Sequence, residues 1–204
     1  MAEETQRVRV KTVTLLSDNW YVLKTTTFDF LRRDGRWQTL SRETYDRGHG
    51  AVILLYHPQT QEVVLVRQFR YPAYVTGHDG FLLEAPAGLL DAADPEHRIR
   101  EEVEEETGYQ VGDVQKVFEA FMSPGSVTER LHFFVAPFDP GQRSGQGGGL
   151  EAEGEDIEVV LMPFTDAMQK VASGEICDAK TIMLLQYAAL QLFGKGADDQ
   201  TAAG

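Results

Sequence analysis

Five of the six residues from Glu101 to Glu106 are glutamate, which makes this the most acidic segment of the chain. On a helix each residue turns by about 100°, so Glu102, Glu105 and Glu106 share one face. Like charges spaced four residues apart destabilise an isolated helix, and a hard cation is therefore their natural partner. Carboxylate oxygens suit Mg²⁺ or Mn²⁺ rather than zinc. The alternative is an acidic face that is only solvated, as most charge runs are.

The segment carries clear signals for where its helix begins and ends. Asp94, followed by proline, is a strong N-cap with Pro at the first helical position, and Gly108 is a typical stop. The sequence therefore predicts a helix over Pro95–Thr107. A tight loop at Ala85–Gly88 precedes it, and a short strand at Phe81–Glu84 precedes the loop.

This strand, loop and acidic helix resemble the signature of the Nudix hydrolase family: Gly, five residues, Glu, seven residues, then Arg-Glu-aliphatic-x-Glu-Glu-x-Gly-aliphatic. The matching positions are Gly88, Glu102, Val103, Glu105, Glu106, Gly108 and Tyr109. The chain departs from the signature in three ways. Its spacing between the two glycines is one residue shorter, Asp94 replaces the first Glu, and Glu101 stands at the usual Arg. Arg100 lies one step earlier, and a turn of about 100° prevents it from simply taking over that role.

The shorter spacing is similar to that of the Nudix branch that acts on GDP-mannose. The same branch looks similar in further motifs, up to about Phe193: LSDN (16–19), RETYDRG (42–48), VRQFR (66–70), MSPG (122–125) and GGG before an acidic loop. The resemblance implies metal-dependent hydrolysis of the pyrophosphate bond of a nucleoside diphosphate sugar. GDP-mannose is favoured, giving GMP and mannose 1-phosphate. The alternatives are a hydrolase of ADP-ribose or another nucleoside diphosphate derivative, and a non-catalytic nucleotide-binding module.

The resemblance also implies a set of metal ligands. Glu102 and Glu106 would hold Mg²⁺ (or Mn²⁺) together with the backbone carbonyl of Ala87. Glu105 would be a further ligand or would hold a metal-bound water, which makes it a catalytic candidate. The ions would neutralise the phosphate oxygens, polarise phosphorus and lower the pKa of a bound water.

A second acidic region lies in a glycine-rich setting, where six glycines precede or interrupt the four acidic residues of segment 141–156. Such a composition cannot rigidify through its own packing, which on composition alone favours a disordered connection. A mobile loop with carboxylates also fits a lid that completes a site when substrate binds. On the resemblance, Glu155 is the loop's metal ligand and Glu153 is the leading candidate for the catalytic base, ahead of Glu151.

Several residues are candidates for substrate binding. Guanidinium groups suit phosphate geometry, so arginines are candidates for phosphate contacts, with ordinary surface ion pairing as the alternative. Trp20 could stack on a base or lie in a core. Two further residues match substrate-contacting positions of the branch. The candidates are Trp20, Arg42, Arg67, Arg70, Glu129 and Lys180.

The chain as a whole predicts an α/β protein, a Nudix fold with a mixed sheet in an α/β/α sandwich and an N-terminal antiparallel β extension. We expect an N-terminal β unit over residues 1–46, a hydrolase domain over 47–193 and a flexible tail over 194–204. The expected strands are 8–16, 21–31, 37–45, 51–56, 63–70, 114–120, 130–136 and 157–162, and the later helices are 164–172 and 179–193. In the last helix Met183, Leu184, Tyr187 and Leu190 form a stripe that predicts core packing.

The short N-terminal β unit cannot bury its aromatic residues well alone. It is expected to pack on a partner subunit in a homodimer, or else to fold back on its own domain. In the dimer, Trp20 and Arg42 would serve the partner's site.

Composition sets further limits. With 19 Lys and Arg against 32 Asp and Glu, the net charge of −13 argues against nonspecific nucleic-acid or anionic-membrane binding. The single cysteine, Cys177, excludes an internal disulfide and a Cys-based zinc cluster. No apolar run approaches membrane-spanning length, and the N-terminus lacks a signal-peptide core. The protein is expected to be soluble and cytoplasmic.

Overall fold

The computed structural model describes residues 6–90 and 94–194, so the predicted tail from residue 195 onward lies outside the described residues. The chain forms two compact units. The first comprises the chain up to His49 together with Phe121–Arg130, and the second comprises Gly50–Ala120 and the chain from Leu131 onward. No helix within the described residues is long and apolar enough to cross a membrane.

The first unit contains an antiparallel three-stranded sheet in the order β1-β2-β3. Its strands are β1 (Val8–Asp18), β2 (Val22–Leu31) and β3 (Trp37–Asp46). The turn before β3 contains Gly35 at φ +80°, a conformation that glycine adopts without steric cost. The three predicted N-terminal strands and their hairpin are therefore confirmed.

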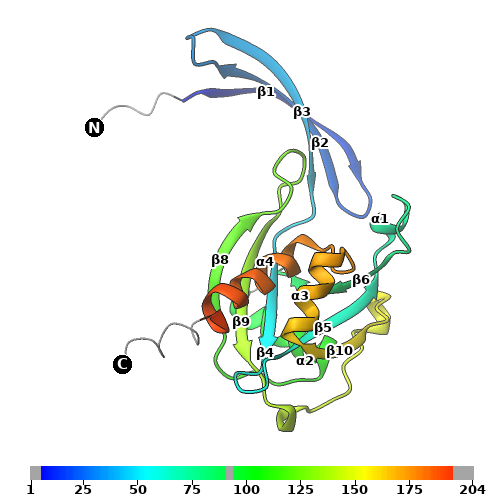
Figure 1. Cartoon of the computed structure of the whole chain (residues 1–204). Coiled ribbons are helices and arrows are strands. Elements are labelled where there is room, and N and C mark those ends of the chain that lie inside the picture. Colours follow the sequence, from blue (N-terminus) through cyan, green and yellow to red (C-terminus); the bar gives the residue numbers. More distant parts are fainter. Residues whose placement is uncertain (1–5, 91–93, 195–204) are drawn as a thin grey trace, which may run out of the picture. The chain divides into compact units, whose positions relative to one another are not determined.

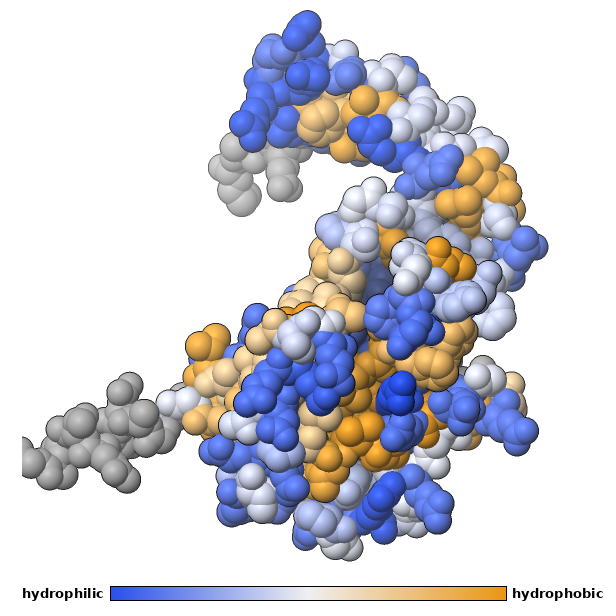
Figure 2. Space-filling model, turned by 45° about the vertical axis from the view of Figure 1, so that its right-hand side comes forward, coloured by the Kyte–Doolittle hydropathy of each residue, from blue (hydrophilic) through white to orange (hydrophobic). Residues whose placement is uncertain are grey.

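Successive residues of β1 point to opposite faces of the sheet, and a bulge between Val10 and Thr12 shifts this alternation by one residue. On either side of the bulge, Val8, Val10, Val13 and Leu15 stand opposite Phe30, Phe28, Thr26 and Lys24 of β2. Because opposed residues share a face and a bulge shifts the alternation by one, these apolar β1 residues lie on one face. The middle of the other face is polar, with a hydrogen bond between Thr27 and Ser41, while Leu31 and Trp37 stand at one end of it. The apolar β1 residues are exposed, and hydrophobic side chains show at the surface of this sheet in Figure 2.

The second unit is built on a mixed seven-stranded sheet in the order β10-β5-β4-β9-β8, with β6 paired to β5 and β7 paired to β4. Strand β4 is parallel to β9 and antiparallel to β5. The strands are β4 (Gly50–Tyr56), β5 (Glu62–Phe69), β6 (Phe81–Glu84), β7 (Ala87–Leu89), β8 (Gln115–Phe121), β9 (Arg130–Pro137) and β10 (Glu158–Pro163). The helices are α1 (Tyr71–Tyr74), α2 (Pro95–Thr107), α3 (Phe164–Ser173) and α4 (Ala179–Tyr187). Short 3₁₀ turns lie at Pro140–Gln142 and Glu151–Glu153.

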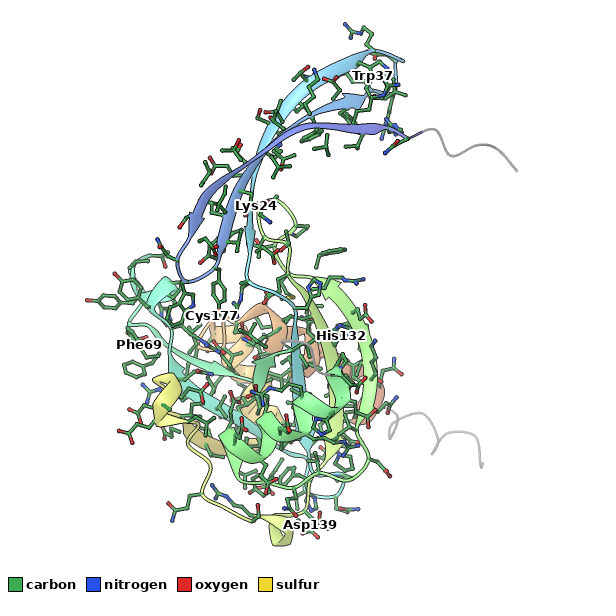
Figure 3. All side chains as sticks on the ribbon, turned by 180° about the vertical axis from the view of Figure 1, so that it is seen from behind. Lys24, Trp37, Phe69, His132, Asp139 and Cys177 are labelled. Atoms are coloured by element: carbon green, nitrogen blue, oxygen red, sulfur yellow. The ribbon has the colours of Figure 1, made fainter. Side chains whose placement is uncertain are left out.

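Helices cover both faces of this sheet. Figure 1 shows α3 and α4 on one face, and Figure 3, seen from behind, shows α2 on the other. Strand β4 is buried from Gly50 to Leu55, as expected for a strand covered on both sides. Ala51, Ile53 and Leu55 of β4 belong to the core cluster that includes Ile99 and Val103 of α2. The predicted α/β/α sandwich with a mixed sheet and an N-terminal antiparallel extension is confirmed.

Two local predictions need correction, and one short helix was not predicted. The loop expected at Ala85–Gly88 is partly strand. Strand β4 pairs with β5 only at its carboxyl end, and β7 pairs with the first residues of β4 instead. Helix α1 was not predicted, since a single turn carries too few residues for a periodic signal. The helix predicted to Phe193 changes to a π-helical turn at Ala188–Leu192. The wider turn rotates Leu190 out of the expected core stripe, and its side chain is 71% exposed.

Candidate active site

Helix α2 begins and ends where the sequence predicts. The Asp94 carboxylate accepts hydrogen bonds from the backbone N–H groups of Glu96 (3.1 Å) and His97 (3.2 Å). At the other end Gly108 adopts φ 73° and donates its N–H to the carbonyl of Glu104 at 3.0 Å. These caps satisfy backbone groups that every helix end leaves free. They fix which residues of the acidic run face the sheet.

The carboxylates of α2 divide as the helical spacing predicts. Glu102 and Glu106 are buried, Glu105 is half-buried, and Glu101 and Glu104 are exposed. Glu106 is only 1% exposed. Burying a charged group without a partner is strongly unfavourable, so this face must be matched by counter-charges or hydrogen-bond donors.

The segment Ala85–Gly88 contacts this face. The Ala87 N–H donates to Glu106 Oε2 at 3.3 Å. At Gly88 a Cβ atom would overlap the Glu102 carboxylate, so only glycine allows that carboxylate to pack here. The Ile53 N–H of β4 fixes the segment by donating to the carbonyl of Pro86 at 3.0 Å. The pairing of β7 with β4 therefore holds the backbone of Ala87 and Gly88 against two glutamates.

Glu106 lies in an environment that disfavours its negative charge. Burial, followed by the nearby charges of Glu102 and Glu155, raises the pKa of Glu106 well above its ordinary value, and the opposing effects of Arg70 and the Ala87 N–H are smaller. Oxygen donors that repel one another in a buried position fit a hard divalent cation. Within residues 6–90 and 94–194 no three His, Cys, Asp or Glu side chains already converge as a metal cluster. The carboxylates of Glu102, Glu105 and Glu106 fit a divalent cation chemically, and in this structure they contact protein groups.

Arg98 is the main such partner. Its Nη2 lies 2.6 Å from Glu102 Oε1, and its Nη1 lies 3.3 Å from Glu101 and 3.6 Å from Glu105. Its Nε donates to the carbonyl of Leu89 at 3.4 Å. A role for Arg98 was not predicted from the sequence, although its spacing of four residues from Glu102 was a usable signal.

Arg100, by contrast, takes no part in the carboxylate face. Its Nη2 donates to Glu96 at 2.8 Å and its Nη1 donates to the carbonyls of Val111 and Gly112. The expectation that Arg100 does not replace the missing consensus arginine is confirmed.

The glycine-rich stretch packs on the carboxyl end of α2. The N–H groups of Gly148 and Gly149 donate to the carbonyls of Glu106 (2.9 Å) and Glu105 (3.1 Å), and the Ser144 N–H donates to the carbonyl of Gly108. At Gly147 a Cβ atom would overlap the carbonyl oxygen of Glu106. The stretch therefore caps the helix through close backbone approach, and the disordered connection favoured by its composition was the wrong alternative.

This packing brings the loop's carboxylates toward α2 in part. Glu155 Oε2 accepts a hydrogen bond from the Leu150 N–H at 2.9 Å, and its charge acts on Glu106. Glu151 is exposed in the 3₁₀ turn. Glu153 ends that turn, but its side chain is not among those that the structure describes.

Two predicted substrate contacts meet at a third, unpredicted residue. Arg70 and Lys180 both pair with Glu84, at 2.9 Å and 3.0 Å from its Oε2 atom. Arg70 also acts electrostatically on Glu106. Arg67, in contrast, pairs with Glu158 at 3.7 Å and stacks over Phe81, which matches the surface alternative.

The other predicted substrate contacts belong to the first unit. Trp20 is 82% exposed in the β1–β2 turn, so the core alternative for it is wrong. Arg42 is exposed on β3 and donates to the carbonyl of Ser41. Glu129 is buried and lies 3.4 Å from Arg47.

Comparison with known proteins agrees with this architecture. A family model described as "NUDIX domain" matches residues 46–185, and one described as "GDP-mannose pyrophosphatase NudK N-terminal domain" matches residues 7–45. A GDP-mannose pyrophosphatase of Klebsiella pneumoniae subsp. pneumoniae is 51% identical over 188 residues, 92% of this chain and 94% of that protein. Those of Pectobacterium atrosepticum (54%, covering 89% and 94%) and Escherichia coli K12 (50%, covering 90% and 95%) are similarly related.

Among solved structures, a crystal structure of an "ADP compounds hydrolase" has a TM-score of 0.72 to this chain. It covers 94% of this chain and 97% of its own, at 18% sequence identity. At that identity the likeness shows the fold alone.

Proposed function

The chain belongs to the Nudix hydrolase family, and on that basis we propose that it hydrolyses the pyrophosphate bond of GDP-mannose to GMP and mannose 1-phosphate. The observation that carries the proposal is the buried Glu102 and Glu106 pair, packed against Ala87 and Gly88. The choice of GDP-mannose is supported by relatives of that activity, about half identical over nearly the whole chain.

A Nudix hydrolase needs a divalent metal ion, and we propose Mg²⁺, with Mn²⁺ as a substitute. Glu102, Glu106 and the Ala87 carbonyl would hold it, with Glu155 from the loop. When bound, the ion neutralises the phosphate oxygens and lowers the pKa of an attacking water. The raised pKa of Glu106, caused first by burial and then by Glu102 and Glu155, supports this assignment.

The remaining side chains would bind the substrate and move the proton. Glu153 is proposed to accept the proton of the attacking water, with Glu105 holding a further water or ion. Arg70 and Lys180 are proposed to bind phosphate oxygens. Trp20, Arg42 and Glu129 are proposed to contact the substrate beyond the pyrophosphate.

The direct test is a matched pair of variants on α2. Glu106→Gln removes the buried charge, whereas Glu104→Gln alters an exposed glutamate of the same helix. We expect Glu106→Gln to lose at least about 100-fold in kcat with an unchanged circular dichroism spectrum, and Glu104→Gln to retain activity. A Glu106→Gln enzyme with wild-type turnover would refute the assignment.

We further propose a homodimer in which a second copy covers the apolar face of β1. This face carries Val8, Val10, Val13 and Leu15, all exposed, and exposed apolar patches mark interaction surfaces. Val13→Lys should convert the dimer to a monomer in light scattering, whereas Thr14→Lys, on the polar face of the same strand, should not. A monomeric wild-type protein would contradict the proposal.

Two expectations about the whole protein remain predictions. The division into residues 1–46, 47–193 and 194–204 would give the N-terminal unit the role of dimerisation. A cytoplasmic location is compatible with Cys177, a free and exposed thiol, because reducing compartments keep thiols free. The net charge of −13 supports the absence of nucleic-acid and anionic-membrane partners.

A further inference from the structure

Glu84 is a buried carboxylate at the end of β6 on which two cations from distant parts of the chain converge. The residue is only 1% exposed. Arg70, just after β5, donates to it through Nε (3.2 Å) and Nη2 (2.9 Å). Lys180, in the first turn of α4, donates through Nζ at 3.0 Å. An ionised carboxylate is tolerated in such a position only when it is paired and hydrogen-bonded.

The surrounding charges keep this carboxylate ionised. Burial acts to raise the pKa of Glu84, but the charge of Lys180 and the hydrogen bonds and charge of Arg70 outweigh it and hold the pKa below its ordinary value. Glu84 therefore presents a fixed negative charge between the two cations.

Both cations are held firmly, and the charge of Arg70 also acts on a proposed metal ligand. Lys180 has a second partner in Asp178 at 3.0 Å, whose other oxygen caps α4 by accepting from the Thr181 N–H. The Arg70 guanidinium is half-exposed, its bonds to Glu84 use one edge of the fork, and its charge acts on Glu106. Arg70 therefore links Glu84 with Glu106 electrostatically.

We propose that Glu84 is a positioning residue for substrate binding: it fixes Arg70 and Lys180 at a set separation, at which the two cations bind the pyrophosphate oxygens. This inference rests on the proposed pyrophosphatase function. Glu84 itself does not touch the substrate. Its negative charge holds two cations together that would otherwise repel each other, so their geometry is formed before substrate arrives, which lowers the entropic cost of binding.

The test is Glu84→Gln, which keeps the shape and removes the charge. Because Arg70 and Lys180 would bind oxygens that are charged in both the ground state and the transition state, the loss should appear mainly in KM. We expect KM for GDP-mannose to rise about tenfold or more with kcat within about threefold, a change of about 1.4 kcal/mol in binding. A wild-type KM in the folded variant would overturn the proposal.

A control separates positioning from stability. Val135 of β9 is 1% exposed and belongs to a strand that pairs with β4, so Val135→Ala should lower Tm by leaving a cavity without touching Glu84 or its two cations. We expect its KM to stay at the wild-type value. If Val135→Ala raises KM as much as Glu84→Gln does, loss of stability explains both and the positioning role is refuted.

Two further measurements keep the test decisive. Methylenediphosphonate binding, measured by calorimetry with Mg²⁺, should weaken about tenfold in Glu84→Gln, whichever nucleoside diphosphate derivative is the substrate. An inactive wild-type enzyme would therefore refute the proposed function, while unchanged diphosphonate binding in the variant would refute the positioning role. If Glu84→Gln does not fold, Glu84→Asp takes its place. Its shorter carboxylate cannot reach both cations, so a wild-type KM there would also overturn the proposal.

Discussion

Removing Arg98 should make the protein bind Mg²⁺ more tightly. The guanidinium of Arg98 holds Glu102 at 2.6 Å and approaches Glu105 at 3.6 Å, and Glu102 is one of the proposed metal ligands. A metal ion and Arg98 therefore compete for the same carboxylate. Arg98→Ala removes one competitor and its positive charge.

The size of the effect follows from Coulomb's law. Two unit charges at about 4 Å interact by about 1 kcal/mol in bulk water and about 4 kcal/mol at the effective dielectric of a protein surface. The Arg98 side chain is 20% exposed, so solvent screens it in part and the lower end of this range applies. About 1 kcal/mol corresponds to a roughly fivefold higher affinity. The metal-free variant should in turn lose stability, since the carboxylates then repel one another without a counter-ion.

Isothermal titration calorimetry with Mg²⁺ measures this directly, and Arg100→Ala is the matched control. Arg100 lies on the same helix and carries the same charge, but it bonds to Glu96 and to the carbonyl of Val111. We expect Arg98→Ala to bind Mg²⁺ roughly fivefold more tightly and Arg100→Ala to bind like the wild type. Equal or weaker Mg²⁺ binding by Arg98→Ala would show that Arg98 does not compete with the metal.

Three more predictions concern the loop and the buried carboxylate. Gly147→Ala and Gly154→Ala should each lower the free energy of unfolding by at least about 1 kcal/mol, because both glycines have positive φ. Gly147→Ala should lower the free energy of unfolding further and also reduce activity, because its Cβ would overlap the Glu106 carbonyl, whereas a Cβ at Gly154 has open space. Equal urea midpoints for the two variants would contradict this. The folded-state pKa of Glu106 is raised by burial and by Glu102 and Glu155, so its contribution to stability in EDTA is full below the ordinary carboxyl pKa and is lost as pH rises through the raised value. Tm in EDTA should therefore fall more steeply above pH 5 in the wild type than in Glu106→Gln, and parallel profiles would count against this. Saturating Mg²⁺ should reverse that difference because bound metal favours the ionised carboxylate, and a Tm profile unchanged by Mg²⁺ would argue against metal binding at this site.

Local signals in the sequence were sufficient for the acidic helix. Asp94 and Gly108 fix its two ends, and the helical period then determines that Glu102 and Glu106 are buried while Glu104 is exposed. These features depend on residues within one turn or two of each other, so they follow from propensity and periodicity.

Features that depend on distant contacts did not follow from the sequence. Glu84 and Lys180 are 96 residues apart, and nothing in either segment indicates that they pair. A lone acid at the end of the apolar run Phe81–Glu84 was a hint that this carboxylate would be buried with a partner. The packing of Gly148 on the end of α2 was equally hidden, because composition reports flexibility and not the backbone contacts that restrain it.

The proposed reaction is cleavage of the pyrophosphate bond of GDP-mannose with a divalent metal ion. The most direct test incubates the purified protein with GDP-mannose and Mg²⁺, with EDTA as the control, and separates the products by chromatography beside ADP-ribose reactions. We expect GMP and mannose 1-phosphate in equal amounts, formed only with the metal and faster than AMP forms from ADP-ribose. No GMP with Mg²⁺ or Mn²⁺, or equal product in EDTA, would contradict it.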